Sequence, residues 1–286
     1  MLKERPLSTI LPREAPHAAA CYGEGDRVVS QAIELVQYRS LIRNLVAKDL
    51  KVRYKNSALG FLWSLLNPLL MMVVFTFVFT QLLNQNIPDF PVFVLAALLP
   101  WNWTATAVAA GTTTLVDNAP LINKVYFPRH LLPISVVLSN MANFVLALPA
   151  LFLFMAIFGL PFTPWILYLP VIVLVQAIFL AGLVLFLAPL HVYFRDTIVL
   201  VEVGLMAWMF MTPIFYPIEA VAPNLAPWMY RINPLAAIVA EYRTILYHGG
   251  VPDPLFMART GATAVLLLIA GYLLFNRLNR NVGEHL

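Results

Sequence analysis

Residues 165–189 read WILYLPVIVLVQAIFLAGLVLFLAP and contain no Lys, Arg, Asp or Glu. A helix needs about 20 apolar residues to cross the hydrocarbon core of a bilayer, and this stretch exceeds that length. The whole chain has the same character, because 61% of its 286 residues are hydrophobic and 11% are charged, against about 25% charged in soluble domains. The sequence therefore predicts an integral membrane protein.

Five further stretches share this apolar character, so we expect an all-α fold with six transmembrane helices. Prolines inside several stretches favour kinked helices, which membranes tolerate where neighbours satisfy the freed carbonyls. The fifth stretch contains Glu202, and the sixth contains Arg259 at its edge. The six expected spans are Phe61 to Leu83, Pro91 to Ala110, Leu132 to Phe158, Trp165 to Pro189, Thr197 to Tyr216 and Ala258 to Asn276.

The distribution of positive charge predicts the orientation of these spans. Of the 18 Lys and Arg residues, only Arg231, Arg243 and Arg259 fall on one side of the expected layout. Positive residues are retained in cytoplasmic loops, so the other side, with both termini, is predicted to be cytoplasmic. The net charge of +4 is then a topology signal near the membrane surface, and a nucleic-acid partner is not expected.

The chain is expected to have four parts. Residues 1–30 are rich in Pro, Ala and charge and fit a flexible cytoplasmic tail, residues 31–57 an amphipathic interface helix, residues 58–280 the six-span transmembrane domain, and residues 281–286 a second cytoplasmic tail. In the interface helix, polar residues recur at spacings of three and four, opposite an apolar face. Arg39, Arg43 and Arg53 lie on or near that apolar face, where they either reach lipid headgroups or meet an anionic substrate.

The longest connection, Pro217 to Met257, lies on the side opposite the termini and is expected to hold external amphipathic helices. Asn233 is a candidate helix cap, Pro234 suits the first helical position, and Gly249 and Gly250 end the pattern. Two roles fit equally well. The helix either gates a path between spans or only covers their hydrophobic ends.

Several kinds of chemistry have no support in the sequence. No phosphate-binding P-loop is present, the five His residues are scattered, and Cys21 is the only cysteine. No metal site and no catalytic residue is expected, so the chain is not predicted to be an enzyme. Glu202 lies on a face similar to that of Arg195, and it either pairs structurally near the inner surface or lines a path.

Residues 118–133, NAPLINKVYFPRHLLP, place cations among bulky hydrophobes between the second and third expected spans. Asp117 or Asn118 can cap a short helix with Pro120 in its first turn, and Pro128 ends it. A solvated linker would not need so many large apolar residues. The helix either docks into a cytoplasmic partner or tucks into the membrane surface.

These stretches together resemble a known family. YRSLIRNLVAKDLKVRYKNSALGFLWSLLNPLLMMVVFTFVF at 38–79, the 118–133 stretch, VYFRD at 192–196 and TPIFYP at 212–217 are similar to the permease subunit of bacterial polysaccharide ABC exporters. That family includes the O-antigen, capsule and teichoic acid permeases, and the likeness covers about residues 35 to 280. It implies a homodimer that works with two copies of a cytoplasmic ATPase, which binds the ATP and Mg, so that this chain itself holds no cofactor.

The resemblance also implies roles for particular residues. The substrate would be a polysaccharide on undecaprenyl pyrophosphate or a similar lipid, exported through the bacterial cytoplasmic (inner) membrane. The residues expected to couple to the ATPase are Asn118, Leu121, Lys124, Tyr126, Phe127 and Arg129. Aromatic candidates for lining the substrate path are Trp63, Phe75, Phe79, Trp101, Trp103, Trp208, Phe210, Phe215 and Tyr216. Candidates for binding the pyrophosphate or headgroup are Arg39, Arg43, Arg53 and Arg195.

Two other functions compete with this one. An ABC permease for drugs or small lipids would share the six spans but not the NPLL and FPR stretches in this arrangement. A stand-alone secondary transporter would need no ATPase. It would usually need several ionisable groups within the membrane, whereas Glu202 stands almost alone.

Overall fold

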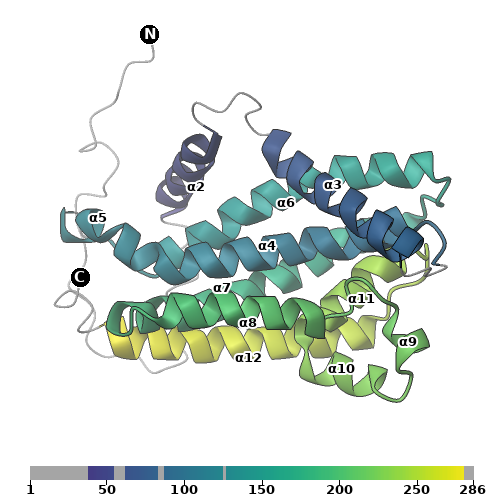
Figure 1. Ribbon diagram of the computed structural model, residues 1–286. Coiled ribbons are helices and arrows are strands. Elements are labelled where there is room, and N and C mark those ends of the chain that lie inside the picture. Colours follow the sequence, from purple (N-terminus) through teal and green to yellow (C-terminus); the bar gives the residue numbers. More distant parts are fainter. Residues whose placement is uncertain (1–37, 55–61, 83–86, 125–126, 280–286) are drawn as a thin grey trace, which may run out of the picture. The chain divides into compact units, whose positions relative to one another are not determined.

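The computed structural model describes residues 38–54, 62–82, 87–124 and 127–279. All secondary structure in these ranges is helical. The chain separates into two compact units, Met1–Leu41 and Ile42–Leu286; apart from residues 38–41, which include the start of α2, the described residues lie in the second. The elements (Figure 1) are α2 (Arg39–Tyr54), α3 (Leu62–Phe77), the π-helix η2 (Val78–Leu82), α4 (Phe90–Asp117), α5 (Ala119–Lys124), α6 (Leu131–Ile157), the 3₁₀ helix η3 (Pro164–Tyr168), α7 (Leu169–Tyr193), α8 (Thr197–Met211), α9 (Ile218–Val221), α10 (Ala226–Ile232), α11 (Pro234–Leu246) and α12 (Pro254–Asn279).

Four helical segments are long and apolar enough to cross a bilayer. They run over Phe90–Asp117, Leu131–Ile157, Pro164–Tyr193 and Pro254–Asn279, and they are between 26 and 30 residues long. They correspond to the second, third, fourth and sixth predicted spans. The segments Leu66–Leu82 and Thr197–Met211 are apolar but shorter, and they occupy the positions of the first and fifth.

The expected fifth span is too long in the prediction. The predicted span extends to Tyr216, but α8 ends at Met211, and the following TPIFYP stretch does not continue the helix. Pro213 explains the difference, because proline lacks the N–H that a continuing helix needs and disfavours a helical conformation at Thr212 before it. The stretch is apolar, so hydropathy alone assigns it to the span and does not show that the helix ends before it.

Helix α4 packs against α3, α6, α7, α8 and α11, and α6 runs along it in Figure 1. Helices α7 and α12 form another close pair. Their backbones touch at Gly182 and Gly271, where a Cβ added to Gly271 would lie 2.1 Å from the carbonyl oxygen of Gly182. Small residues at such crossings let membrane helices approach closely, and van der Waals contact then holds them together.

A buried polar network joins three of the helices. Gln176 of α7 donates from Nε2 to the Pro100 carbonyl at 2.9 Å and to Thr104 Oγ1 at 3.1 Å, both on α4. Its Oε1 accepts from the Tyr242 hydroxyl of α11 at 3.0 Å. Both polar ends of the buried amide are thus satisfied, which removes the cost of placing it in an apolar core.

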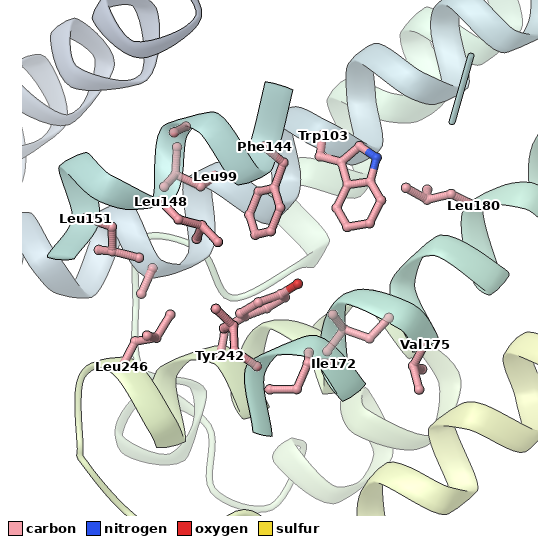
Figure 2. Close-up of a cluster of buried hydrophobic side chains, with 14 of the residues drawn as sticks. Leu99, Trp103, Phe144, Leu148, Leu151, Ile172, Val175, Leu180, Tyr242 and Leu246 are labelled. Carbon is pink, nitrogen blue, oxygen red and sulfur yellow. The ribbon is translucent and has the colours of Figure 1, made fainter. Parts of the chain in front are cut away.

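The largest hydrophobic cluster surrounds this network (Figure 2). Trp103 of α4 stacks on Phe144 of α6 with ring centroids 5.2 Å apart. Phe144 meets the edge of Tyr242 at 5.8 Å, and Figure 2 shows Tyr242 projecting between Phe144 and Ile172 of α7. This row of three rings connects the α4–α6 contact to α11.

Helix α11 begins as predicted but is more buried than an amphipathic surface helix. The side chain of Asn233 accepts from the backbone N–H groups of Leu235 at 3.1 Å and Ala236 at 3.3 Å, so it is the predicted cap. The helix packs against α4, α7 and α12, and even Glu241 and Arg243 are buried. It belongs to the core of the fold.

Candidate functional site

One candidate region is the corner where α4 turns into α5. Only Asn118 separates the two helices, and its backbone carbonyl accepts from Leu121 N at 3.0 Å and Ile122 N at 3.1 Å. Its side-chain Nδ2 donates back to the Thr114 carbonyl of α4 at 2.9 Å. Asn118 therefore stands at the N-cap position of α5, as one of the two predicted alternatives has it, while its side-chain amide donates to the end of α4.

Helix α2 contacts this corner through polar bonds. Lys48 Nζ donates to Asn118 Oδ1 at 3.2 Å, and the Ser139 hydroxyl of α6 donates to Asp49 Oδ2 at 3.2 Å. Leu45 on the apolar face is buried, whereas Lys51 is exposed, as the predicted amphipathic pattern requires. Helix α2 is thereby tied to both α4 and α6.

The end of α12 joins the same corner. Arg129, just before α6, donates from Nη1 to the carbonyl oxygen of Asn279 at 3.1 Å and to its Oδ1 at 3.2 Å. The Tyr193 hydroxyl at the end of α7 donates to the Leu278 carbonyl at 2.8 Å. The last carbonyls of a helix have no partner within it, and a cation there also complements the helix dipole.

The predicted coupling residues divide into two groups in this corner. Lys124 is exposed and Leu121 is half-buried, so both can meet a partner. Phe127 is only 7% exposed, and Arg129 is engaged by α12, so these two hold the corner together. Tyr126 lies outside the described residues. The coupling role of the set stays a prediction.

The second candidate region is a pocket of about 310 Å³ between α3, α4 and α6. Each helix presents one face to it, since the lining residues recur at spacings of three and four. The polar lining residues are Asn67, Asn102, Thr106, Asn140 and Asn143. The aromatic ones are Trp63, Trp103 and Phe144, and the rest are Pro68, Leu99 and Ala147. The pocket therefore combines neutral hydrogen-bonding groups with aromatic rings.

Asn140 is the most constrained polar group of the pocket. Its side chain is 2% exposed, and its Nδ2 donates to the Val136 carbonyl at 2.8 Å. Its Oδ1 is buried and has no hydrogen-bond partner among the described residues. An unpaired amide oxygen in an apolar environment costs about 1–3 kcal/mol, so a ligand that donates a hydrogen bond here would remove that cost.

The predicted path-lining aromatics do not form one surface. Trp63 and Trp103 line the pocket. Phe210 on α8 is exposed, and the Tyr216 hydroxyl donates to its carbonyl at 3.1 Å. The others pack with one another inside the chain: the Phe75 and Phe215 centroids lie 4.2 Å apart and those of Trp101 and Trp208 6.4 Å apart, and Phe79 stacks on Phe215.

The predicted pyrophosphate-binding arginines are not gathered into one described site. Arg43 on α2 and Arg195 between α7 and α8 are both exposed. Arg39 belongs to the other compact unit, and the side chain of Arg53 lies outside the description. Glu202 also lies on an exposed face of α8.

The sequence did not predict two features, the amide side chains of the pocket and the burial of Arg243. The pocket amides could have been found from the sequence, because burying an Asn side chain inside an apolar span costs free energy and therefore marks a candidate functional site. Arg243 was counted only as a loop charge. Its guanidinium is buried, donates to the carbonyls of Phe93 at 3.3 Å, Pro213 and Ile214, and lies 3.6 Å from the centre of the Phe93 ring. Burial lowers the pKa of Arg243 to about 9, which leaves it charged at neutral pH.

Except for α12, the helices that build both regions lie within a match to a known family. The model of the ABC-2 type transporter family matches residues 40–247, from α2 to the end of α11. The chain belongs to the ABC-2 type transporter family. Within this ABC-2 transporter, the match includes α5 and every residue of the pocket.

Two relatives are similar in sequence to this ABC-2 transporter over most of its length. It is 39% identical over 256 residues to the O-antigen export system permease protein RfbA of Myxococcus xanthus, covering 88% of this chain and 97% of the relative. It is 33% identical over 238 residues to the protein of the same name from Klebsiella pneumoniae, covering 83% of this chain and 91% of the relative.

Proposed function

We propose that this chain is the permease subunit of an ATP-driven exporter that moves a lipid-linked polysaccharide across the bacterial cytoplasmic membrane. The glycan class is of the O-antigen, capsular or teichoic-acid type. The observation that carries the proposal is the likeness to O-antigen export permeases at 39% and 33% identity over nearly their whole length. The sequence has no P-loop, so ATP and Mg would bind to a separate ATPase subunit.

The proposed layout has six spans, with α3 and η2 as the first and α8 as the fifth, and both termini in the cytoplasm. At 1.5 Å per residue the apolar segments Leu66–Leu82 and Thr197–Met211 reach about 26 and 22 Å, which a locally thinned bilayer or a partner chain accommodates. Both helices expose apolar side chains, which supports a homodimer or lipid contact on these faces. These side chains include Leu70, Met71, Val74 and Phe77 on α3 and Val199, Leu200, Val203 and Met206 on α8.

In the proposed mechanism, two cytoplasmic ATPase copies press on α5 through Leu121 and Lys124. The corner spreads that movement, since Asn118 is bonded to α2 and Arg129 to the end of α12. Helices α3 and α8 of the two copies then shift to open a path for the glycan. Arg39, Arg43, Arg53 and Arg195 are proposed to meet the pyrophosphate at the inner surface, because guanidinium binds phosphate through two parallel bonds.

The test is to purify the permease in nanodiscs with its proposed ATPase partner, and to score the polymer at the cell surface. The variant Leu121→Ala/Lys124→Glu changes the outward groups of α5 and spares the buried Phe127. We expect the complex to form, ATP hydrolysis to persist and surface polymer to be lost. Lys51→Glu, an exposed lysine on α2, is the matched control and should export normally.

Two results would overturn this assignment. If no ATPase associates with the wild-type permease, the ABC mechanism is wrong, and the chain is an independent transporter. If deletion of the permease leaves the surface polymer intact while a drug or small lipid accumulates in the cell, the substrate class is wrong.

A further inference from the structure

We propose that the pocket between α3, α4 and α6 is a binding site for an uncharged sugar ring of the exported glycan, one site within each permease chain. The inference rests on the proposed function and adds where a single sugar unit is held. It is drawn from the neutral polar groups, the aromatic walls and the buried acceptor that these three helices bring together.

The polar groups of the pocket match sugar hydroxyls. Four Asn side chains and the Thr106 hydroxyl line it, and each amide offers both donors and an acceptor. A sugar hydroxyl likewise donates and accepts. It can donate to Asn140 Oδ1, the buried oxygen that has no partner in the described chain, while neighbouring amides donate to it.

The walls match the apolar faces of a sugar. Trp103 is held in place, because its indole N–H donates to the Val137 carbonyl at 3.3 Å and its ring stacks on Phe144. Trp63 lies in the first turn of α3 and is 49% exposed, so it can close over a ring that has entered. Aromatic faces offer contact area without fixed charge or a large loss of side-chain entropy.

The residues that line the pocket do not suit the other two parts of the substrate, the pyrophosphate and the lipid chain. Among the residues that the structure describes, no Lys or Arg lines the pocket, so a pyrophosphate held by these residues alone would be buried without a counter-charge. A polyprenyl or acyl chain would cover the Asn groups with hydrocarbon and leave them unpaired. A volume of about 310 Å³ lies at the small end of ligand pockets, which suits one or two sugar units.

The position of the pocket also fits a substrate in transit. Asn140 is nine residues into α6 from Leu131, or about 14 Å along the helix, and Thr106 is eleven residues from the end of α4, or about 17 Å. The site is thus well inside the apolar length of both helices. A molecule that reaches it has left the aqueous phase for a low-dielectric environment, in which neutral hydrogen bonds are stronger than in water.

The test measures access to the pocket by cysteine labelling. Cys21 is the only native cysteine, so Cys21→Ser gives a thiol-free background. Thr106→Cys then places a thiol at the mouth, and Ala110→Cys places one a turn further along the same exposed face of α4, outside the pocket. The rate of maleimide labelling is measured on the permease–ATPase complex in nanodiscs.

Three probes separate the parts of the substrate: the lipid-linked polysaccharide extracted from the host, the glycan released from it by mild acid, and the released lipid. We expect the first two to slow labelling of Thr106→Cys by roughly tenfold at about ten times their Kd, with Ala110→Cys unchanged. Adding Asn140→Leu should abolish the protection, and Asn140→Gln should keep part of it.

Each other outcome contradicts the proposal. Protection by the lipid alone would make the pocket a lipid site, and equal protection of both cysteines would indicate a general closure of the helices. If the wild-type complex exports polymer but the glycan protects neither cysteine, the sugar site is wrong and the proposed function stands. If no ATPase associates and no polymer depends on the permease, the proposed function itself is wrong.

Discussion

Arg129 donates two hydrogen bonds to Asn279, one to its carbonyl oxygen at 3.1 Å and one to its side-chain oxygen at 3.2 Å, although the residues are 150 positions apart. Asn279 ends α12, and Arg129 follows α5. The bond therefore joins the last helix of the fold to the segment proposed to receive the ATPase. We propose that this link passes a movement of α5 to α12.

Replacing Arg129 with Ala should weaken that corner. The two bonds involve a charged donor at a half-buried site, so we expect a loss of about 1–2 kcal/mol in the free energy of unfolding. The measurement is the thermal midpoint of the permease in nanodiscs. Arg277→Ala, which removes an exposed cation from the last turn of α12, is the control and should change the midpoint little. Equal midpoints for Arg129→Ala and wild type would show that the corner contributes no stability.

Gly271→Ala should disrupt the contact between α7 and α12. The added Cβ would lie 2.1 Å from the Gly182 carbonyl oxygen, so one helix has to move, at about 1–3 kcal/mol. Gly261→Ala on the same helix is the control, because its Cβ would meet only Val175 Cγ2 at 3.7 Å. We expect size-exclusion chromatography after brief heating to recover less Gly271→Ala than Gly261→Ala. Equal recovery would mean that the two backbones are not in contact.

Arg243→Lys should be nearly as damaging as Arg243→Met. Three carbonyls accept from the guanidinium, and Phe93 lies against its face. A lysine ammonium cannot reproduce that planar fork, and each buried carbonyl left unpaired costs about 1–3 kcal/mol. Limited proteolysis should cut the 212–217 stretch faster in both variants. Arg231→Met, at an exposed arginine, should leave the rate unchanged, and rescue by Lys would show that charge alone is sufficient.

Glu241 should make stability depend on pH. Burial raises the pKa of Glu241 from 4.5 to about 7, with Asp253 opposing its ionisation by charge and stabilising it by a hydrogen bond. Since the folded pKa lies above the unfolded one, the contribution is fully present below pH 4.5 and is lost as the pH rises from 4.5 to 7. Thermal midpoints at pH 5 and pH 7.5 should therefore differ less in Glu241→Gln than in wild type. Glu202→Gln, on an exposed face, should keep the wild-type difference, and parallel behaviour of all three proteins would exclude Glu241 as the cause.

Features set by local chemistry could be predicted from the sequence. The long apolar runs form helices, because a backbone in hydrocarbon has to bond to itself. Asn233 caps α11 because its side chain reaches the N–H groups of residues two and three positions on. Hydropathy alone does not predict the end of α8, because it does not register the effect of Pro213 on the helix.

By itself, the sequence determined that this is a helical membrane protein, and its motifs indicated the family to which it belongs. Only the tertiary structure decided that Asn67, Asn102 and Asn140 face one pocket, that Phe127 is buried, and that Arg129 meets the end of α12. The physical reason is the separation in sequence of the residues that interact. A cap or an apolar run acts over a few residues, whereas a pocket or a cross-link depends on which faces of distant helices pack together, and hydropathy does not encode that choice.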